Sequence, residues 1–186
     1  MNTRRQITLS LLLIAFVSAD AAAEAASDRS GYAGLQTRPI KALSDEQIAD
    51  LRAGRGMGYA LAAELNGYPG PVHVLEHAEA LDLSPTQRRH TERLFREMQA
   101  EAVALGERLI GLEAELERLF AEGVADPATV EAASRDASIV EGALRATHLR
   151  YHLVMRDLLT AEQMRRYTSL RGYTGPEQGH GRGHGH

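Results

Sequence analysis

Apolar residues recur every three or four positions along two long stretches of the chain. The first stretch comprises Leu94, Met98, Ala102, Leu105, Leu109, Leu112, Leu116 and Leu119. The second comprises Val130, Ala133, Ala137, Val140, Leu144, Thr147, Tyr151 and Leu158. This spacing places a continuous apolar stripe on one face of a helix. Because no stretch alternates with a period of two, we expect helices and no strands.

The sequence AEGVADPAT separates the two stripes. Gly123 suits the position just after a helix end, Asp126 suits an N-cap, and Pro127 suits the first helical turn. A short connector between two long amphipathic helices favours an antiparallel pair. We therefore predict an all-α fold built on a long antiparallel helical hairpin with short flanking helices.

Three pentapeptides share the pattern of a leucine, a hydroxyl residue, two variable residues and a glutamine. They are LSDEQ at Leu43–Gln47, LSPTQ at Leu83–Gln87 and LTAEQ at Leu159–Gln163. In such a capping box the Ser or Thr side chain accepts a bond from the N3 amide, and the N3 glutamine reaches back to the N-cap amide. Each pentapeptide therefore predicts a helix start.

The remaining segments set the domain boundaries. Arginines, a short apolar run and small residues predict a removed export signal over residues 1–25, with an uncleaved membrane tether as the alternative. Residues 26–39 are expected to be flexible, 40–173 to form the helical domain, and 174–186 a disordered Gly/His-rich tail. Within the domain, a broken helix runs from Leu43 to about Asn66, and a short segment covers Val72 to Ala80. The glycines of GRGMG between them favour close helix packing or a kink over a phosphate loop.

Composition narrows the chemistry. The chain has 186 residues, a formal net charge of −4 and no cysteine, so neither disulfides nor thiolate ligands are available. A slightly acidic chain lacks the excess of basic residues that is typical of nucleic-acid-binding proteins. No pairing of a nucleophile with a base is evident, and the carboxylates are expected along solvated helix faces, so we predict that the protein is not an enzyme.

The histidines are the candidate metal ligands. His73 and His77 are four residues apart, as are His148 and His152, which places each pair on one helix face at a spacing that can hold one ion. The alternative is that His148 and His152 are ordinary solvated residues beside the apolar stripe. His90 stands alone and is predicted to be a surface residue. In the tail, His180, His184 and His186 alternate with glycine and form a separate candidate site for nickel, copper or zinc.

An exported, cysteine-free, all-helical chain with repeated L-[ST]-x-x-Q boxes resembles the Spy/CpxP-like (LTxxQ-motif) periplasmic proteins, over about residues 40–173. That family includes ATP-independent chaperones, envelope-stress modulators and heavy-metal sensor or zinc-resistance proteins. The resemblance implies a bent four-helix cradle that forms a homodimer. It also implies a zinc, nickel, copper or cobalt site at His73, His77, His148 and His152. Met155 and Glu76 are further candidates for that site.

The resemblance thus implies a periplasmic, metal-binding, chaperone-like protein of the envelope or heavy-metal stress response, with no metal required for folding. Unfolded or misfolded envelope proteins are its expected clients, and membrane contact is expected only if the signal stays uncleaved. The alternative is a metal-independent holdase or stress modulator that docks on a sensor kinase or an anti-sigma factor.

Overall fold

The computed structural model describes residues 31–173. The chain divides into two compact units, and the boundary between them in the sequence lies between Arg38 and Pro39. In the first unit the described residues contain a single 3-10 turn, η1 (Leu35–Thr37). The helices belong to the second unit, and all contacts discussed below lie within it.

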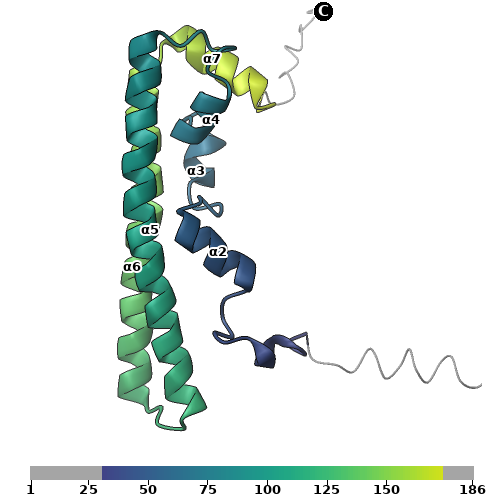
Figure 1. Cartoon of the computed structure of the whole chain (residues 1–186), viewed down its shortest axis with the longest axis vertical. Coiled ribbons are helices and arrows are strands. Elements are labelled where there is room, and N and C mark those ends of the chain that lie inside the picture. Colours follow the sequence, from purple (N-terminus) through teal and green to yellow (C-terminus); the bar gives the residue numbers. More distant parts are fainter. Residues whose placement is uncertain (1–30, 174–186) are drawn as a thin grey trace, which may run out of the picture. The chain divides into compact units, whose positions relative to one another are not determined.

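The second unit consists of helices in the part of the chain that the structure describes. They are α2 (Asp45–Ala53), α3 (Leu61–Glu64), α4 (Pro71–Glu76), α5 (Pro85–Ala121), α6 (Pro127–Leu158) and α7 (Ala161–Leu170). No strand occurs among residues 31–173, so the prediction of an all-α chain is confirmed there. The long helices α5 and α6 lie side by side, α2 to α4 follow one another along this pair, and α7 lies across its end (Figure 1).

The predicted helix starts are confirmed at all three pentapeptides. Ser44, Ser84 and Thr160 are the N-caps of α2, α5 and α7, and each makes a complete capping box with its glutamine. Asp126 caps α6 by accepting bonds from the amides of Ala128 and Thr129. These bonds satisfy amides that have no partner inside their own helix.

Two of the capping glutamines also bond to each other. The Gln87 amide nitrogen donates to the Gln163 side-chain oxygen at 2.9 Å, and the Gln163 nitrogen donates back to Gln87 at 3.1 Å. The same two nitrogens donate to the backbone carbonyls of Leu158 and Leu81. The boxes therefore do more than start helices, since they join the start of α5 to the start of α7.

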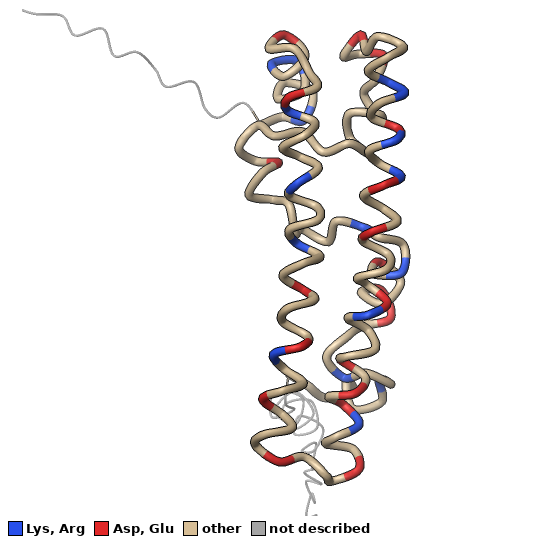
Figure 2. Tube along the Cα trace, turned by 90° about the vertical axis from the view of Figure 1, so that its left-hand side faces the viewer, with Lys and Arg blue, Asp and Glu red and all other residues tan. Residues whose placement is uncertain are grey.

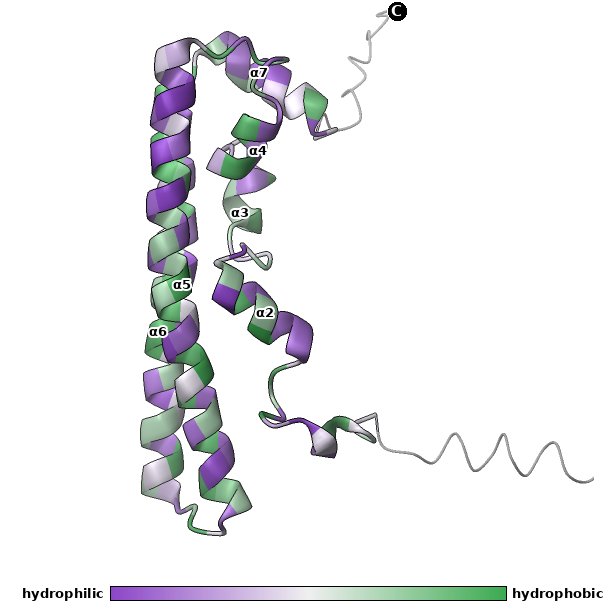
Figure 3. Ribbon diagram, viewed as in Figure 1, coloured by the Kyte–Doolittle hydropathy of each residue, from purple (hydrophilic) through white to green (hydrophobic). Residues whose placement is uncertain are grey.

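The apolar stripes of α5 and α6 meet in two separate clusters of buried side chains. Figure 3 shows how hydrophobic and hydrophilic residues are interspersed along these helices. The first cluster, toward the α5–α6 connector, is formed by Ile40, Leu51, Ala102, Leu109, Ile110, Ala137, Val140 and Leu144. The second, toward α7, is formed by Val74, Leu81, Leu94, Met98, Tyr151, Met155, Leu159 and Tyr167. Along α6 the two clusters are separated by the turn that follows Leu144.

Close packing of α2 on α5 depends on two glycines. Gly54 ends α2 in the left-handed conformation, and a Cβ atom there would lie 2.9 Å from the Gln99 carbonyl oxygen. On α5, a Cβ atom at Gly106 would press into the backbone carbonyl of Leu51. The predicted role of the GRGMG glycines in close helix packing is confirmed for Gly54.

The outer surface carries interspersed acidic and basic residues along both long helices (Figure 2). Many form exposed pairs one helical turn apart, such as Arg118 with Glu115 and Glu122. Exposed pairs of this kind contribute little to stability. Within residues 31–173, none of the helices has the length and hydrophobicity that a membrane span requires.

Replacing Gly106 with alanine should lower the free energy of unfolding by about 1–3 kcal/mol, because the added methyl group overpacks the α2–α5 contact. Gly111 is the matched control, since it lies on the same helix and a Cβ atom there meets nothing within 4 Å. Gly111→Ala should stabilise the protein by up to about 1 kcal/mol through helix propensity alone. Urea unfolding followed by circular dichroism measures both; equal effects of the two substitutions would contradict the proposed close approach.

Candidate binding pocket

Between the two apolar clusters, α6 buries a polar turn. His148 and His152 retain only 3% and 7% of their exposed surface, and Thr147 retains 4%. The interpretation of these two histidines as solvated surface residues is therefore wrong. Buried imidazoles need hydrogen-bond partners or a ligand, because an unpaired buried polar group is costly.

These histidines face a pocket of about 620 Å³. Its walls come from the loop that follows α2, from α3 and α4, and from α5, α6 and the residues after α7. The lining combines apolar and polar side chains, among them Phe95, Met98, Glu64, His73, His148 and His152. A concave pocket with mostly apolar walls and a few polar groups is the usual form of a small-ligand site.

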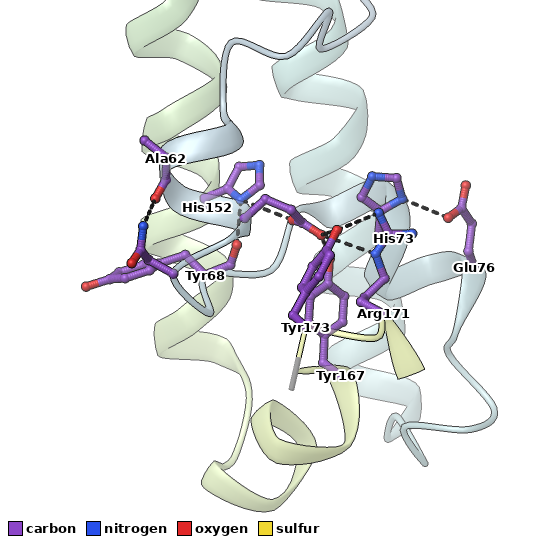
Figure 4. Close-up of polar contacts among 10 residues, drawn as sticks. Ala62, Tyr68, His73, Glu76, His152, Tyr167, Arg171 and Tyr173 are labelled. Carbon is purple, nitrogen blue, oxygen red and sulfur yellow. Dashed lines mark hydrogen bonds and ion pairs between the residues drawn. The ribbon is translucent and has the colours of Figure 1, made fainter. Parts of the chain in front are cut away.

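Glu64 is the buried carboxylate of the pocket, with 6% of its surface exposed. Its Oε1 atom accepts bonds from the hydroxyls of Tyr167 and Tyr173, the latter at 3.2 Å, and from Nε of Arg171 at 3.3 Å (Figure 4). Burial and the bond to Glu64 raise the pKa of the Tyr167 hydroxyl, which keeps it a donor. The second oxygen, Oε2, is buried and has no hydrogen-bond partner.

His152 is held in one orientation. Its Nδ1 atom donates to the backbone carbonyl of Tyr68 at 2.7 Å and lies 3.7 Å from Oε2 of Glu64. A neutral ring with its proton on Nδ1 leaves the lone pair of Nε2 available, the arrangement that a backbone carbonyl imposes on metal-binding histidines. Gly70 makes room for this edge, since a Cβ atom there would lie 3.0 Å from Nε2.

His148 presents an unpaired nitrogen. Its ring stacks on Tyr59, with 6.1 Å between the ring centroids and 19° between the planes, and the Arg145 guanidinium lies over the same tyrosine. The Nε2 atom is buried and has no partner. Burial, and then the nearby His152, lower the pKa of His148, so its neutral form is favoured. A neutral imidazole with an unpaired nitrogen is competent to bind a metal ion.

The other predicted metal ligands do not lie together beside His148 and His152. His73 lines the pocket and bonds Glu76 through Nδ1 at 2.8 Å (Figure 4), whereas His77 is the C-cap of α4 and is not part of the lining. Met155 is fully buried in the second apolar cluster. The tail histidines His180, His184 and His186 lie outside the described residues.

Glu64 was missed by the sequence interpretation, which expected carboxylates on solvated faces. One signal was present, because Glu64 is the only Asp, Glu, Lys or Arg residue between Arg55 and Glu76. A single charge in an otherwise uncharged stretch is a candidate for a buried, paired group.

Within the described residues, no three His, Asp or Glu side chains are grouped closely enough to hold a metal ion by themselves. Searches of protein-family models, of curated proteins and of solved structures find no match to this chain.

The free energy of unfolding, measured with urea in the presence of a chelator, should fall as the pH is lowered from about 7.5 to 5.5. In the unfolded chain His148 takes up a proton near its ordinary pKa of about 6.5. In the folded protein its pKa is lower, so unfolding takes up a proton between the two values and stability is lost as the pH falls through that window. His148→Leu should flatten this dependence, whereas His90→Gln should leave it unchanged. An unchanged slope in His148→Leu would contradict a buried neutral imidazole.

Proposed function

We propose that this chain is a periplasmic, metal-binding, chaperone-like protein of the envelope or heavy-metal stress response. The pocket is its metal site. The observation that carries the proposal is that two residues of the pocket lining each bury an atom without a hydrogen-bond partner, Nε2 of His148 and Oε2 of Glu64. Leaving either atom unpaired costs free energy, and a divalent cation bound to it would offset that cost.

The donor set suits a transition metal. Imidazole and carboxylate ligands fit zinc, nickel, cobalt or copper(II). Magnesium and calcium prefer oxygen ligands and are less suited to a site with two imidazoles. Because no three described His, Asp or Glu side chains are grouped closely enough to hold an ion alone, two of His148, His152 and Glu64 would hold it together with water. Tyr68 would act as the outer partner that orients His152. His73 stands at the edge of the pocket as a further candidate. The bound ion would supply positive charge that links α3 to α6.

The resemblance to the Spy/CpxP-like proteins supports a proposed helix arrangement, dimer and localisation. In this proposal α5 and α6 form an antiparallel hairpin, and the flanking helices complete a bent four-helix cradle. Two copies of the chain form a homodimer. Export to the periplasm follows from the signal predicted over residues 1–25, which lies outside the described residues.

A metal-independent holdase is the second candidate. Leu61 on α3, its C-cap Leu65 and Leu153 on α6 are exposed, and these two helices are in contact. Exposed apolar side chains on neighbouring helices are a feature of surfaces that bind unfolded segments or partner proteins. Clients or a regulatory partner would then dock without a metal ion.

A titration separates the two candidates. In full-length protein with His180, His184 and His186 replaced by alanine, calorimetry should detect Zn²⁺ or Ni²⁺ binding with a micromolar or lower Kd. His148→Ala with His152→Ala in that background should abolish it, and Glu64→Gln should weaken it by about 10-fold or more. His90→Ala is the control and should bind like the parent. If the parent binds no metal, the pocket is not a metal site and the holdase is the remaining candidate.

A further inference from the structure

Helix α6 carries apolar side chains on a side that faces solvent. Ile139 and Leu153 have 60% and 53% of their surface exposed, and Ala146, midway between them, is exposed as well. Seven residues make nearly two helical turns, so these three side chains lie along one line on the helix surface. The other long helix differs, because α5 exposes no large apolar side chain before Phe120.

This line lies away from every element that packs on α6. Leu144, Tyr151 and Met155 belong to the two apolar clusters that α6 shares with α5, and they lie on the opposite side of the helix. His148 and His152 occupy a third side, which lines the pocket. The remaining side is therefore without a partner in the part of the chain that the structure describes. We call it the outer face of α6, and it consists of Ile139, Gly142, Ala146, Leu149 and Leu153.

Charges of opposite sign stand at the two ends of the outer face. Arg135 and Asp157 each lie eleven residues from Ala146, which is about three turns, so both continue the same line. Their side chains are 58% and 73% exposed. Arg135 pairs with Glu131 and Asp157 with Arg156, but exposed pairs of this kind are weak enough to exchange partners.

We propose that the outer face of α6 binds the same face of a second copy of this chain, antiparallel, with the two-fold axis at Ala146. This register sets Ile139 against Leu153 of the partner subunit and Arg135 against Asp157 of the partner subunit. A two-fold contact requires one self-complementary surface, and features at equal distances from Ala146 meet that requirement. A parallel pair would instead set each charge against its own copy. The inference rests on the proposed homodimer but not on the metal site.

Small residues at the centre allow the two helices to approach closely. Ala146 meets its own copy on the axis, and Leu149 lies over Gly142 of the partner subunit. A Cβ atom at Gly142 would meet nothing within 4 Å in the single chain, so this position is open to a partner. The face from Arg135 to Asp157 is about 33 Å long. One pair of helices over that length buries less than the roughly 800 Å² per partner of a standard interface, so we expect a micromolar Kd.

Sedimentation equilibrium of the full chain, with a chelator present, tests the surface. The parent should dimerise, and Ala146→Glu should raise the Kd at least about 10-fold, because it sets two carboxylates against each other on the axis. Ala104→Glu is the matched control, since Ala104 is an exposed alanine of α5, and it should dimerise like the parent. A parent that stays monomeric at several hundred micromolar would overturn the proposal, and so would equal Kd values for all three proteins.

Exchanging the end charges tests the register. Arg135→Glu and Asp157→Arg should each weaken the dimer by about 3-fold or more, because each sets like charges together at both ends. The double variant restores opposite charges and should return the Kd to within about 2-fold of the parent. A double variant that dimerises no better than the single variants would contradict the antiparallel pairing.

Disulfide trapping gives a second measure of the register, since the chain has no cysteine of its own. Oxidised Ala146→Cys should form a covalent dimer. Leu153→Cys should not, because the two copies of position 153 are about 21 Å apart in this register, beyond disulfide reach. Ile139→Cys combined with Leu153→Cys should form the dimer again. Rapid trapping of Leu153→Cys alone would indicate a parallel pair and overturn the proposal.

The outcomes separate this surface from the function on which it rests. If Ala146→Glu dimerises like the parent, the homodimer stands and the outer face of α6 is not its interface. If the parent is a monomer, both the homodimer and this surface fail. A monomeric parent that binds an unfolded client through Leu153 would assign the face to the holdase instead. Circular dichroism of each variant confirms that the helices are intact.

Discussion

The structure around the pocket depends on burying one carboxylate. An ionised Glu64 inside the protein is tolerated only if its desolvation is offset by donors, and removing one side of a buried ion pair costs about 3–5 kcal/mol. Its partners, Tyr167, Arg171 and Tyr173, lie more than one hundred residues further along the chain. The need for these donors therefore ties the short α3 to α7. The other oxygen, Oε2, is buried 3.7 Å from Nδ1 of His152 on α6 and has no hydrogen-bond partner.

Glu64, His148 and His152 form a layer of buried polar side chains between the two apolar clusters. The first apolar cluster joins α2 to α5 and α6, and the second joins α4 and α7 to the same long pair. The glutamines of two capping boxes, Gln87 and Gln163, close the second cluster by bonding to each other. Apolar packing therefore supplies stability on both sides of the layer that contains the two unpaired atoms, Nε2 of His148 and Oε2 of Glu64. A uniformly apolar core would be more stable there and could not bind an ion.

The sequence predicted the features that depend on local signals. Helix starts follow from hydroxyl and glutamine spacing, and the buried faces of α5 and α6 follow from apolar periodicity. The pocket depends on distant partners, so the sequence could not place it. Glu64 lies on a four-residue helix, and its hydrogen-bond partners come after α6 in the chain. The only local sign of its burial is the lack of other charged residues nearby. His148 and His152 lie beside the apolar stripe, and only packing of α3 and the Gly70 turn over them decides that they are buried.

Hydrogen exchange of α7 in Glu64→Leu tests the central claim most directly. Loss of the carboxylate leaves two tyrosine hydroxyls and a guanidinium without their acceptor, so the account predicts that the amides of α7 exchange at least about 10-fold faster. The amides near the first apolar cluster, around Leu109 and Val140, should change little. Glu97→Leu, at an exposed position of α5, should leave α7 unchanged. Unaltered exchange of α7 in Glu64→Leu would contradict the account.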